Sequence, residues 1–231
     1  QLTLVFLRPL GLRLDIVDIG GESTRPGHIV ISEEEEIARV VPIVEAVKAH
    51  FDVPVSIDTY KGNVAEAALQ AGADLVNDIW GFKFDKKTAL MTAKYNAACC
   101  LMHNKDEAVY NDFLEDMVSE MAECVKIARE AGVADDKIML DPGVGFGKTY
   151  EMNLAAINHV DVLHRLGFPI LLGTSRKSVI GNTLNLPSDQ RVEGTLATTV
   201  IGVMKNCAFV RVHDIKENKR IIQMTKAILA H

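Results

Sequence analysis

A short apolar run that ends in an acidic residue and a glycine-rich loop is the stretch of this sequence most suggestive of chemistry. Residues 137–148 read KIMLDPGVGFGK, so three apolar residues lead into Asp141, and Pro142 and three glycines follow. This pattern is typical of a short buried strand that runs into a close-fitting loop. The carboxylate of Asp141 would be partly removed from water, and it therefore needs donors from its own loop or from a ligand.

Six other apolar runs also end in polar residues: 15–21, 53–59, 73–79, 97–104, 169–178 and 207–214. Asp58, Asn77 and Lys177 lie near the polar ends of three of them. Carboxylates accept paired N–H bonds, asparagine both donates and accepts, and lysine donates to a carbonyl or ring nitrogen. With Asp141, this set suits a flat heterocycle with an amino-pyrimidinone edge. Alternatively, Asp58 and Asn77 cap the helices that follow them, and Lys177 extends into solvent from the first turn of a helix.

The segments between the runs show helical patterns. One opens with a capping box at residues 32–35, and the others cover residues 61–71, 113–128, 152–166, 188–205 and 214–229. Alternating strands and helices predict a parallel sheet, and seven such strands favour a closed (β/α)8 barrel. We therefore expect a single domain over residues 1–231, with its site at the carboxyl ends of the strands.

The first unit of this barrel has an unusual sequence. Residues 1–7, QLTLVFL, could form an eighth strand, but only residues 8–14 separate them from the next run. A parallel crossover needs a dozen or more residues, usually including a helix. The first βα unit is therefore expected to be incomplete, or residues are missing from the sequence.

The last strand carries two further candidates, Arg211 and His213. They occupy alternate positions and should project to the same side. Phosphate often binds after the last strands of such barrels, so this pair suits a pyrophosphate group. The alternative is that Arg211 pairs with an acidic neighbour such as Asp214.

Composition excludes several classes of function. The net charge of −6 argues against nucleic acid as the main partner. No apolar run reaches the ~18 residues that span a bilayer, and four cysteines without CxxC spacing favour a reducing cytoplasm. The loop GVGFGKT is not a P-loop, because Pro142 stands where a glycine is required. No histidine or cysteine spacing indicates zinc, and no metal ligand is predicted.

Taken together, the motifs resemble the dihydropteroate synthases over about residues 15–231. The matching stretches are DIGGESTRPG (18–27), SIDTYK (56–61), NDIWG (77–81), LMHN (101–104), DPGVGFGK (141–148), LLGTSRKSVIG (171–181) and RVHD (211–214). The resemblance implies a (β/α)8 barrel, usually a homodimer, in folate biosynthesis. It implies joining of p-aminobenzoate to 6-hydroxymethyl-7,8-dihydropterin pyrophosphate with the help of Mg2+, and competition by sulfonamides.

Roles can be carried over from the resemblance residue by residue. The pterin would be held by Asp58, Asn77, Asp141 and Lys177, with Ile79, Met102, Phe146 and Gly173 in the same substrate site. Arg211 and His213 would bind the pyrophosphate, and Thr24, Arg25, Pro26 and Ser178 would shape the p-aminobenzoate site. The residues expected to act in catalysis are Asp58, Lys177, Arg211 and His213. Asp58 would stabilise cationic character on the pterin as pyrophosphate leaves.

One departure from the family pattern puts turnover in question. The Asn-x-Thr-Pro-Asp-Ser-Phe loop expected after the first strand is absent, and its asparagine is the expected magnesium contact. Two alternatives to a synthase therefore stay open. One is a pterin-dependent methyltransferase on the same barrel, and the other is a non-catalytic pterin-binding chain.

Overall fold

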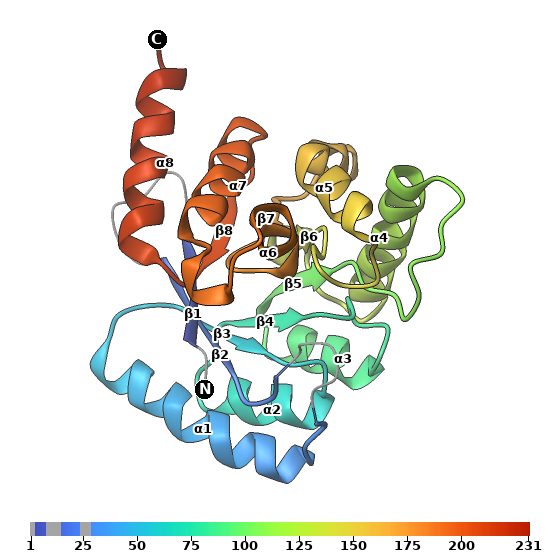
Figure 1. Ribbon diagram of the computed structural model, residues 1–231. Helices are drawn as coiled ribbons and strands as arrows, with labels where there is room; N and C mark the ends of the chain where they lie inside the picture. The colour runs from blue at the N-terminus through green and yellow to red at the C-terminus, as the bar shows by residue number, and fades with distance from the viewer. Residues whose placement is uncertain (1–2, 8–14, 24–28) are drawn as a thin grey trace.

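The computed structural model describes residues 15–23 and 29–231, together with the backbone of residues 3–7 (Figure 1). Its strands are β1 (Thr3–Leu7), β2 (Ile16–Gly20), β3 (Val55–Asp58), β4 (Leu75–Asp78), β5 (Ala98–Met102), β6 (Ile138–Asp141), β7 (Leu171–Leu172) and β8 (Phe209–Val212). Its α-helices are α1 (Glu33–His50), α2 (Gly62–Gln70), α3 (Lys86–Lys94), α4 (Phe113–Glu130), α5 (Tyr150–Asn158), α6 (Ser178–Leu184), α7 (Val192–Met204) and α8 (Ile215–Leu229).

The strands form one sheet in the order β6-β5-β4-β3-β2-β1-β8-β7, and the two ends of this sheet meet. Strands β2 to β6 pair in parallel, as do β7 and β8. A parallel bridge joins Leu140 of β6 to Ile170, and the Leu140 N–H donates to the Pro169 carbonyl at 2.9 Å. The helices lie outside this ring (Figure 1), so the predicted α/β barrel is confirmed.

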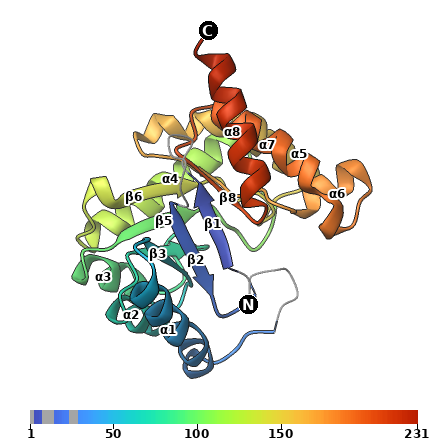
Figure 2. The ribbon, with the colours of Figure 1, turned by 90° about the vertical axis from the view of Figure 1, so that its left-hand side faces the viewer.

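Strand β1 occupies the place of the eighth strand but runs the opposite way. Its backbone pairs antiparallel with both neighbours, Thr3 opposite Ile19 of β2 and Val5 opposite Val212 of β8. Figure 2 shows β1 and β2 side by side. An antiparallel neighbour needs no helical crossover, which accounts for the few residues between the first two strands. Within the described residues, the first unit thus lacks the helix of a βα unit, as expected, and the reason is that β1 and β2 run in opposite directions.

Residues along each strand alternate between two apolar layers. One set packs outward under the helices, as Val17, Ile57, Val76 and Leu140 do. The other set forms a separate buried cluster inside the ring: Ile16, Leu75, Cys100, Met139, Leu171 and Phe209. Because side chains two residues apart share a face, the positions that follow this inner cluster also point into the barrel.

The predicted helices are largely confirmed. Ser32 accepts the Glu35 N–H at 3.2 Å and begins α1, as the capping box indicates. The prediction of one helix over residues 152–166 is wrong, because α5 ends at Asn158 and a 3-10 helix covers Val160–Leu166. The helix expected over residues 188–205 is divided into a 3-10 turn, Ser188–Gln190, and α7. Helices α3 and α6 were not predicted.

Two findings bear on the exclusions made from composition. The four cysteines, all within the described part of the chain, are buried and unpaired. Among the residues that the structure describes, no helix has the length and apolar character needed to cross a membrane.

Candidate active site

A layer of mostly polar residues lies directly above the inner apolar cluster. Each member follows a cluster residue by two positions on its strand, and Asp58 joins them from β3, where it pairs in register with Gly20 and Asn77. This period-two spacing turns all of them toward the mouth of the barrel. The layer consists of Asp18, Asp58, Asn77, Met102, Asp141, Gly173 and Arg211.

Arg211 is held between two carboxylates from neighbouring strands. Its Nε donates to Asp18 Oδ2 at 2.8 Å, and its Nη2 donates to Asp58 Oδ2 at 2.5 Å. The alternative that Arg211 pairs with Asp214 is wrong, because Asp214 pairs with Arg176. Asp18 was not assigned a role from the sequence, although its position two residues after Ile16 places it on the inner face.

The two carboxylates leave unused hydrogen-bonding capacity in the site. Burial raises the pKa of Asp58 to about 7 against the opposing effect of Arg211, and the charge of Asp18 adds to the rise. The Oδ1 atoms of Asp18 and Asp58 are buried and have no hydrogen-bond partner among the described residues. A buried acceptor without a donor is costly, so both oxygens are suited to N–H groups of a ligand.

Lys177 points into the site. It is the N-cap residue of α6, its Nζ donates to the Val144 carbonyl, and it lies 4.7 Å from the centre of the Phe146 ring. Burial lowers the pKa of Lys177 to about 8, while Asp141 favours the charged form. The alternative of a solvated lysine on a first helical turn is therefore wrong.

Asp141 both caps its own loop and faces the site. Its Oδ1 accepts the Gly143 N–H at 2.7 Å. A Cβ atom built on Gly173 would lie 3.2 Å from Asp141 Oδ2 and 3.8 Å from Arg211 Cβ, so Gly173 separates these two charged residues. Burial raises the pKa of Asp141, and Lys177 opposes the rise.

Neither Asp58 nor Asn77 caps a helix. The N-cap residues of α2 and α3 are Lys61 and Asp85. Asn77 is buried, and its carbonyl accepts the Thr59 N–H at 3.1 Å. An asparagine amide at this position offers both a donor and an acceptor to a ligand.

An apolar wall adjoins this polar layer. Ile79 and Met102 are buried with Tyr60 in a small cluster of their own, against which Trp80 and Phe146 pack. Such flat and sulfur-containing side chains suit the faces of an aromatic ring. Three predicted residues, Ile79, Met102 and Phe146, thus come together.

Other predicted residues are not part of this cluster. The Nδ1 atom of the His213 ring lies 2.8 Å from Ser175 Oγ, which also accepts the backbone N–H of His213 at 3.2 Å. Ser178 is exposed on the first turn of α6. Thr24, Arg25 and Pro26 lie outside the described residues. Ser175 was not assigned a role from the sequence, and its contact with His213 depends on the relative placement of β7 and β8.

The described residues do not fit a magnesium site of their own. No group of three histidine, cysteine, aspartate or glutamate side chains that could hold a metal occurs within residues 15–23 and 29–231. The two unpartnered carboxylate oxygens belong to residues that already share the guanidinium of Arg211.

Comparison with known proteins agrees with this geometry. Residues 14–213 match the family described as pterin binding enzyme. A dihydropteroate synthase of Clostridium beijerinckii is 62% identical over 93% of this chain and 80% of its own length. A dihydropteroate synthase of Bacillus subtilis is 52% identical over 93% of this chain and 75% of its own length.

Solved structures give the same result. A Clostridium difficile dihydropteroate synthase crystallised in the presence of pteroic acid has a TM-score of 0.91 and 48% identity, covering 93% of this chain and 82% of its own. A Yersinia pestis enzyme in a sulfonamide drug complex has a TM-score of 0.91 and 39% identity, covering 94% and 82%. A Xanthomonas albilineans enzyme with 4-aminobenzoic acid has a TM-score of 0.91 and 34% identity, covering 94% and 80%.

Proposed function

Since this chain belongs to the pterin-binding enzymes and, among them, to the dihydropteroate synthases, we propose how its own residues divide the work of that reaction. The enzyme is a transferase. The methylene carbon of 6-hydroxymethyl-7,8-dihydropterin pyrophosphate loses its bond to a pyrophosphate oxygen and gains one to the amino nitrogen of p-aminobenzoate. The amine releases a proton, and the products are 7,8-dihydropteroate and pyrophosphate.

The pterin ring would bind in the polar layer. Asp58 Oδ1, which has no partner among the described residues, would accept a ring N–H, and Asn77 and Asp141 would pair with the remaining edge. Lys177 would donate to a carbonyl or ring nitrogen. The face of the ring would rest on the wall formed by Ile79, Met102 and Phe146, while Gly173 leaves space beside Asp141.

The charged residues of the site would stabilise the charges that develop on the pterin and on pyrophosphate as their bond breaks. As pyrophosphate departs, positive charge spreads over the pterin, and the carboxylate of Asp58 in its buried setting would stabilise it. Arg211 and His213 would balance the leaving group. Arg211 already pairs with Asp18 and Asp58, so it would contribute one edge of its guanidinium while those carboxylates fix its orientation.

The second substrate, p-aminobenzoate, would bind next to the pterin, on the side nearer to solvent. Thr24, Arg25, Pro26 and Ser178 are proposed to surround p-aminobenzoate, and the exposed position of Ser178 leaves it accessible to a ligand. Solved relatives in complex with 4-aminobenzoic acid and with a sulfonamide drug support binding of both kinds of compound by this chain. The arylamine is a sufficient nucleophile once both substrates are aligned.

The observation that carries this proposal is the convergence of Asp58, Asn77, Asp141 and Lys177 on one barrel mouth beside an apolar wall. Incorporation of radiolabelled p-aminobenzoate into dihydropteroate by the purified chain tests it. Pterin binding by calorimetry without product would instead favour the non-catalytic alternative. The named relatives are synthases, which favours this activity over the methyltransferase alternative.

Four further expectations stay proposals. Magnesium would have to be held largely by the pyrophosphate. Loss of activity in a chelator, with recovery on added Mg2+, would support a magnesium requirement, and no step of the proposed reaction depends on the ion.

The second proposal is that the enzyme acts in the cytoplasm, where cysteines stay reduced, because the four cysteines are buried and unpaired. A single domain over residues 1–231 and a homodimer are also proposed.

A further inference from the structure

The glycine-rich loop between β6 and α5 is fastened by Lys148 at its end. The Lys148 Nζ donates to the carbonyls of Gly143 and Phe146, each at 2.9 Å, and to that of His103 at 3.3 Å. It also lies 2.9 Å from His103 Nδ1. An ammonium group has three donors and no acceptor, so these four acceptors share all the hydrogen bonds it can make.

His103 connects this ammonium to the outer face of the barrel. The side chain is fully buried, and burial together with the charge of Lys148 lowers the pKa of His103 to about 2, so the ring is neutral. Burial also lowers the pKa of Lys148 to about 7, while Asp141 favours its charged form. Because the carboxylate of Glu120 can only accept, the ring proton of His103 is on Nε2 and Nδ1 accepts from Lys148. That proton is donated to Glu120 Oε2 at 2.8 Å.

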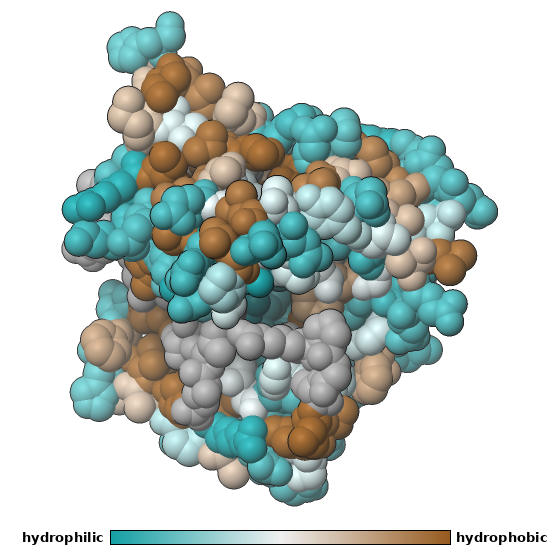
Figure 3. Space-filling view, viewed as in Figure 1, coloured by the Kyte–Doolittle hydropathy of each residue, from teal (hydrophilic) through white to brown (hydrophobic). Residues whose placement is uncertain are grey.

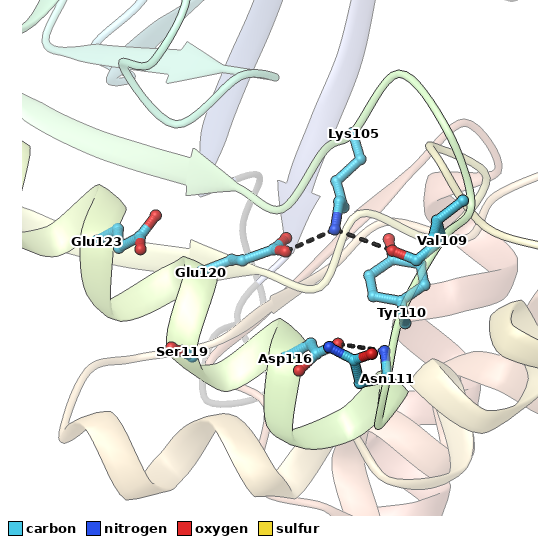
Figure 4. A pocket seen from close by; sticks show the side chains of 8 residues that line it. All are labelled: Lys105, Val109, Tyr110, Asn111, Asp116, Ser119, Glu120 and Glu123. Atoms are coloured by element: carbon cyan, nitrogen blue, oxygen red, sulfur yellow. Dashed lines mark hydrogen bonds and ion pairs between the residues drawn. The ribbon is translucent and has the colours of Figure 1, made fainter.

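Glu120 is the outer end of this series of contacts. Its Oε1 accepts from Lys105 Nζ at 2.7 Å, and Lys105 also donates to the Val109 carbonyl at 3.0 Å, as Figure 4 shows. These residues line a hollow of about 300 Å3 between α4 and the loop that precedes it. Tyr110, on the same loop, donates to the Gly147 carbonyl at 2.8 Å.

The loop fastened in this way supplies several parts of the pterin site. Its Gly143 N–H bonds to Asp141, its Val144 carbonyl accepts from Lys177, and its Phe146 forms part of the apolar wall. A Cβ atom on Gly143, whose φ is +67°, would lie 1.9 Å from the His103 carbonyl. The loop therefore runs against the end of β5 with no space to shift toward it.

We propose that Lys148, oriented by His103 and Glu120, is a positioning residue that sets the affinity for the pterin substrate by holding the loop of Phe146 and Val144 in place. The inference rests on the proposed function of that site. Lys148 does not itself provide a contact with the pterin. It acts through the carbonyls it gathers, and Glu120 acts through the tautomer it imposes on His103.

The test compares Lys148→Met with Lys148→Arg and with a matched control, Lys83→Met. Lys83 donates at 3.3 Å to the Asn104 carbonyl near the same end of β5 and makes no bond to the glycine-rich loop. Lys148→Met should raise the KM for the pterin pyrophosphate, and the Kd of pteroic acid by calorimetry, by about 10- to 100-fold. The KM for p-aminobenzoate should change much less, Lys148→Arg should recover part of the loss, and Lys83→Met should behave as the unaltered chain.

Pterin affinity unchanged in Lys148→Met would overturn the inference. Equal rises in both KM values with a matching fall in Tm would also overturn it, because they indicate only general loosening. Glu120→Ala gives a second measurement if Lys148→Met does not fold, since it should raise pterin KM by a smaller factor. If the unaltered chain binds pteroic acid but forms no product, the proposed function fails while the calorimetric comparison still decides the inference.

Discussion

The two oxygens of Asp58 have different surroundings, and this difference predicts how the residue should respond to substitution. Oδ2 bonds to Arg211, whereas Oδ1 is buried with no donor among the described residues. Arg211 keeps Asp18 as a partner if the charge of Asp58 is removed. Burial also raises the pKa of Asp58, so the charged form is costly to maintain in the folded chain.

Asp58→Asn should therefore lower kcat/KM for the pterin pyrophosphate without lowering Tm. The loss should be about 10- to 100-fold, as expected for one charged hydrogen bond of about 1.5–3 kcal/mol. Steady-state kinetics and thermal unfolding measure the two effects separately. Asp136→Asn, an exposed aspartate at the opposite end of β6, is the control and should change neither. An unaltered kcat/KM in Asp58→Asn would remove Asp58 from the proposed pterin contacts.

Lys177 predicts a pH dependence of pterin binding. Burial lowers the pKa of Lys177 to about 8, so the ammonium form that would donate to the pterin is lost as pH rises through that value. The KM for the pterin pyrophosphate should therefore rise as pH increases above about 8. Lys177→Gln should have a higher KM with no such rise. The same rise in Lys177→Gln would assign the titration to another group.

Side chains on the strands could be predicted from the sequence better than side chains that act through loops. Asp58, Asn77 and Asp141 follow buried runs, and period-two alternation is enough to place them at one mouth. The role of Lys148 could not be predicted, because its four acceptors come together only when the loop folds against β5. The pairing of Arg211 with Asp18 depends on β1 and on barrel closure, which bring the first and last strands close together.

At the level of secondary structure, α1 and α2 are joined to β2 by a buried charge cluster centred on Lys61. Its Nζ bonds to Glu22 Oε2 at 2.7 Å, to Glu36 Oε2 at 2.8 Å and to the Ile31 carbonyl at 2.8 Å. Burial alone would raise the pKa of Glu22, but hydrogen bonds from Lys61 and Tyr60 lower it to about 2. The stabilisation from Glu22 is thus complete above its ordinary pKa and is lost as pH falls toward 2.

Lys61→Met should destabilise the fold strongly, because it leaves two carboxylates buried without their cation. We expect a loss of about 3–5 kcal/mol in the free energy of unfolding, measured with urea at neutral pH. The matched control is Lys48→Met, which removes an exposed pair with Asp74 and should cost about 0–1 kcal/mol. Similar costs for the two substitutions would mean that the buried cluster contributes little.

Direction and closure of the strands are properties of the whole barrel and had to come from the structure. The apolar residues of β1 predict a strand but do not specify which way it runs. Its antiparallel pairing with β2 and β8 follows from a short connection and from two sheet edges that would otherwise remain unpaired. The break between α5 and the following 3-10 helix was missed because the apolar periodicity continues across it.

The surface of the molecule carries the remaining prediction, that of a homodimer. Apolar side chains lie exposed on α7 and α8, where Met204 and Met224 are each 58% accessible and Ile228 is 62% accessible. Figure 3 shows hydrophobic residues over these two helices, which pack side by side. Burying such side chains against a second copy would remove apolar area from water at about 25 cal/mol per Å2.

Met224→Glu should therefore shift the chain from dimer to monomer in sedimentation velocity at micromolar concentration, because a charge in an apolar interface loses its hydration without gaining a partner. Phe51→Glu is the matched control, since Phe51 is also an exposed apolar residue but lies just after α1 and not on α7 or α8. Phe51→Glu should sediment as the unaltered chain does. A monomeric unaltered chain would show that this interface does not exist. A dimer that survives Met224→Glu but not Phe51→Glu would place the interface elsewhere.

The same variant tests whether the dimer supports the pyrophosphate end of the site. Because α8 follows closely after Arg211 and His213, loss of the dimer in Met224→Glu should then raise the KM for the pterin substrate.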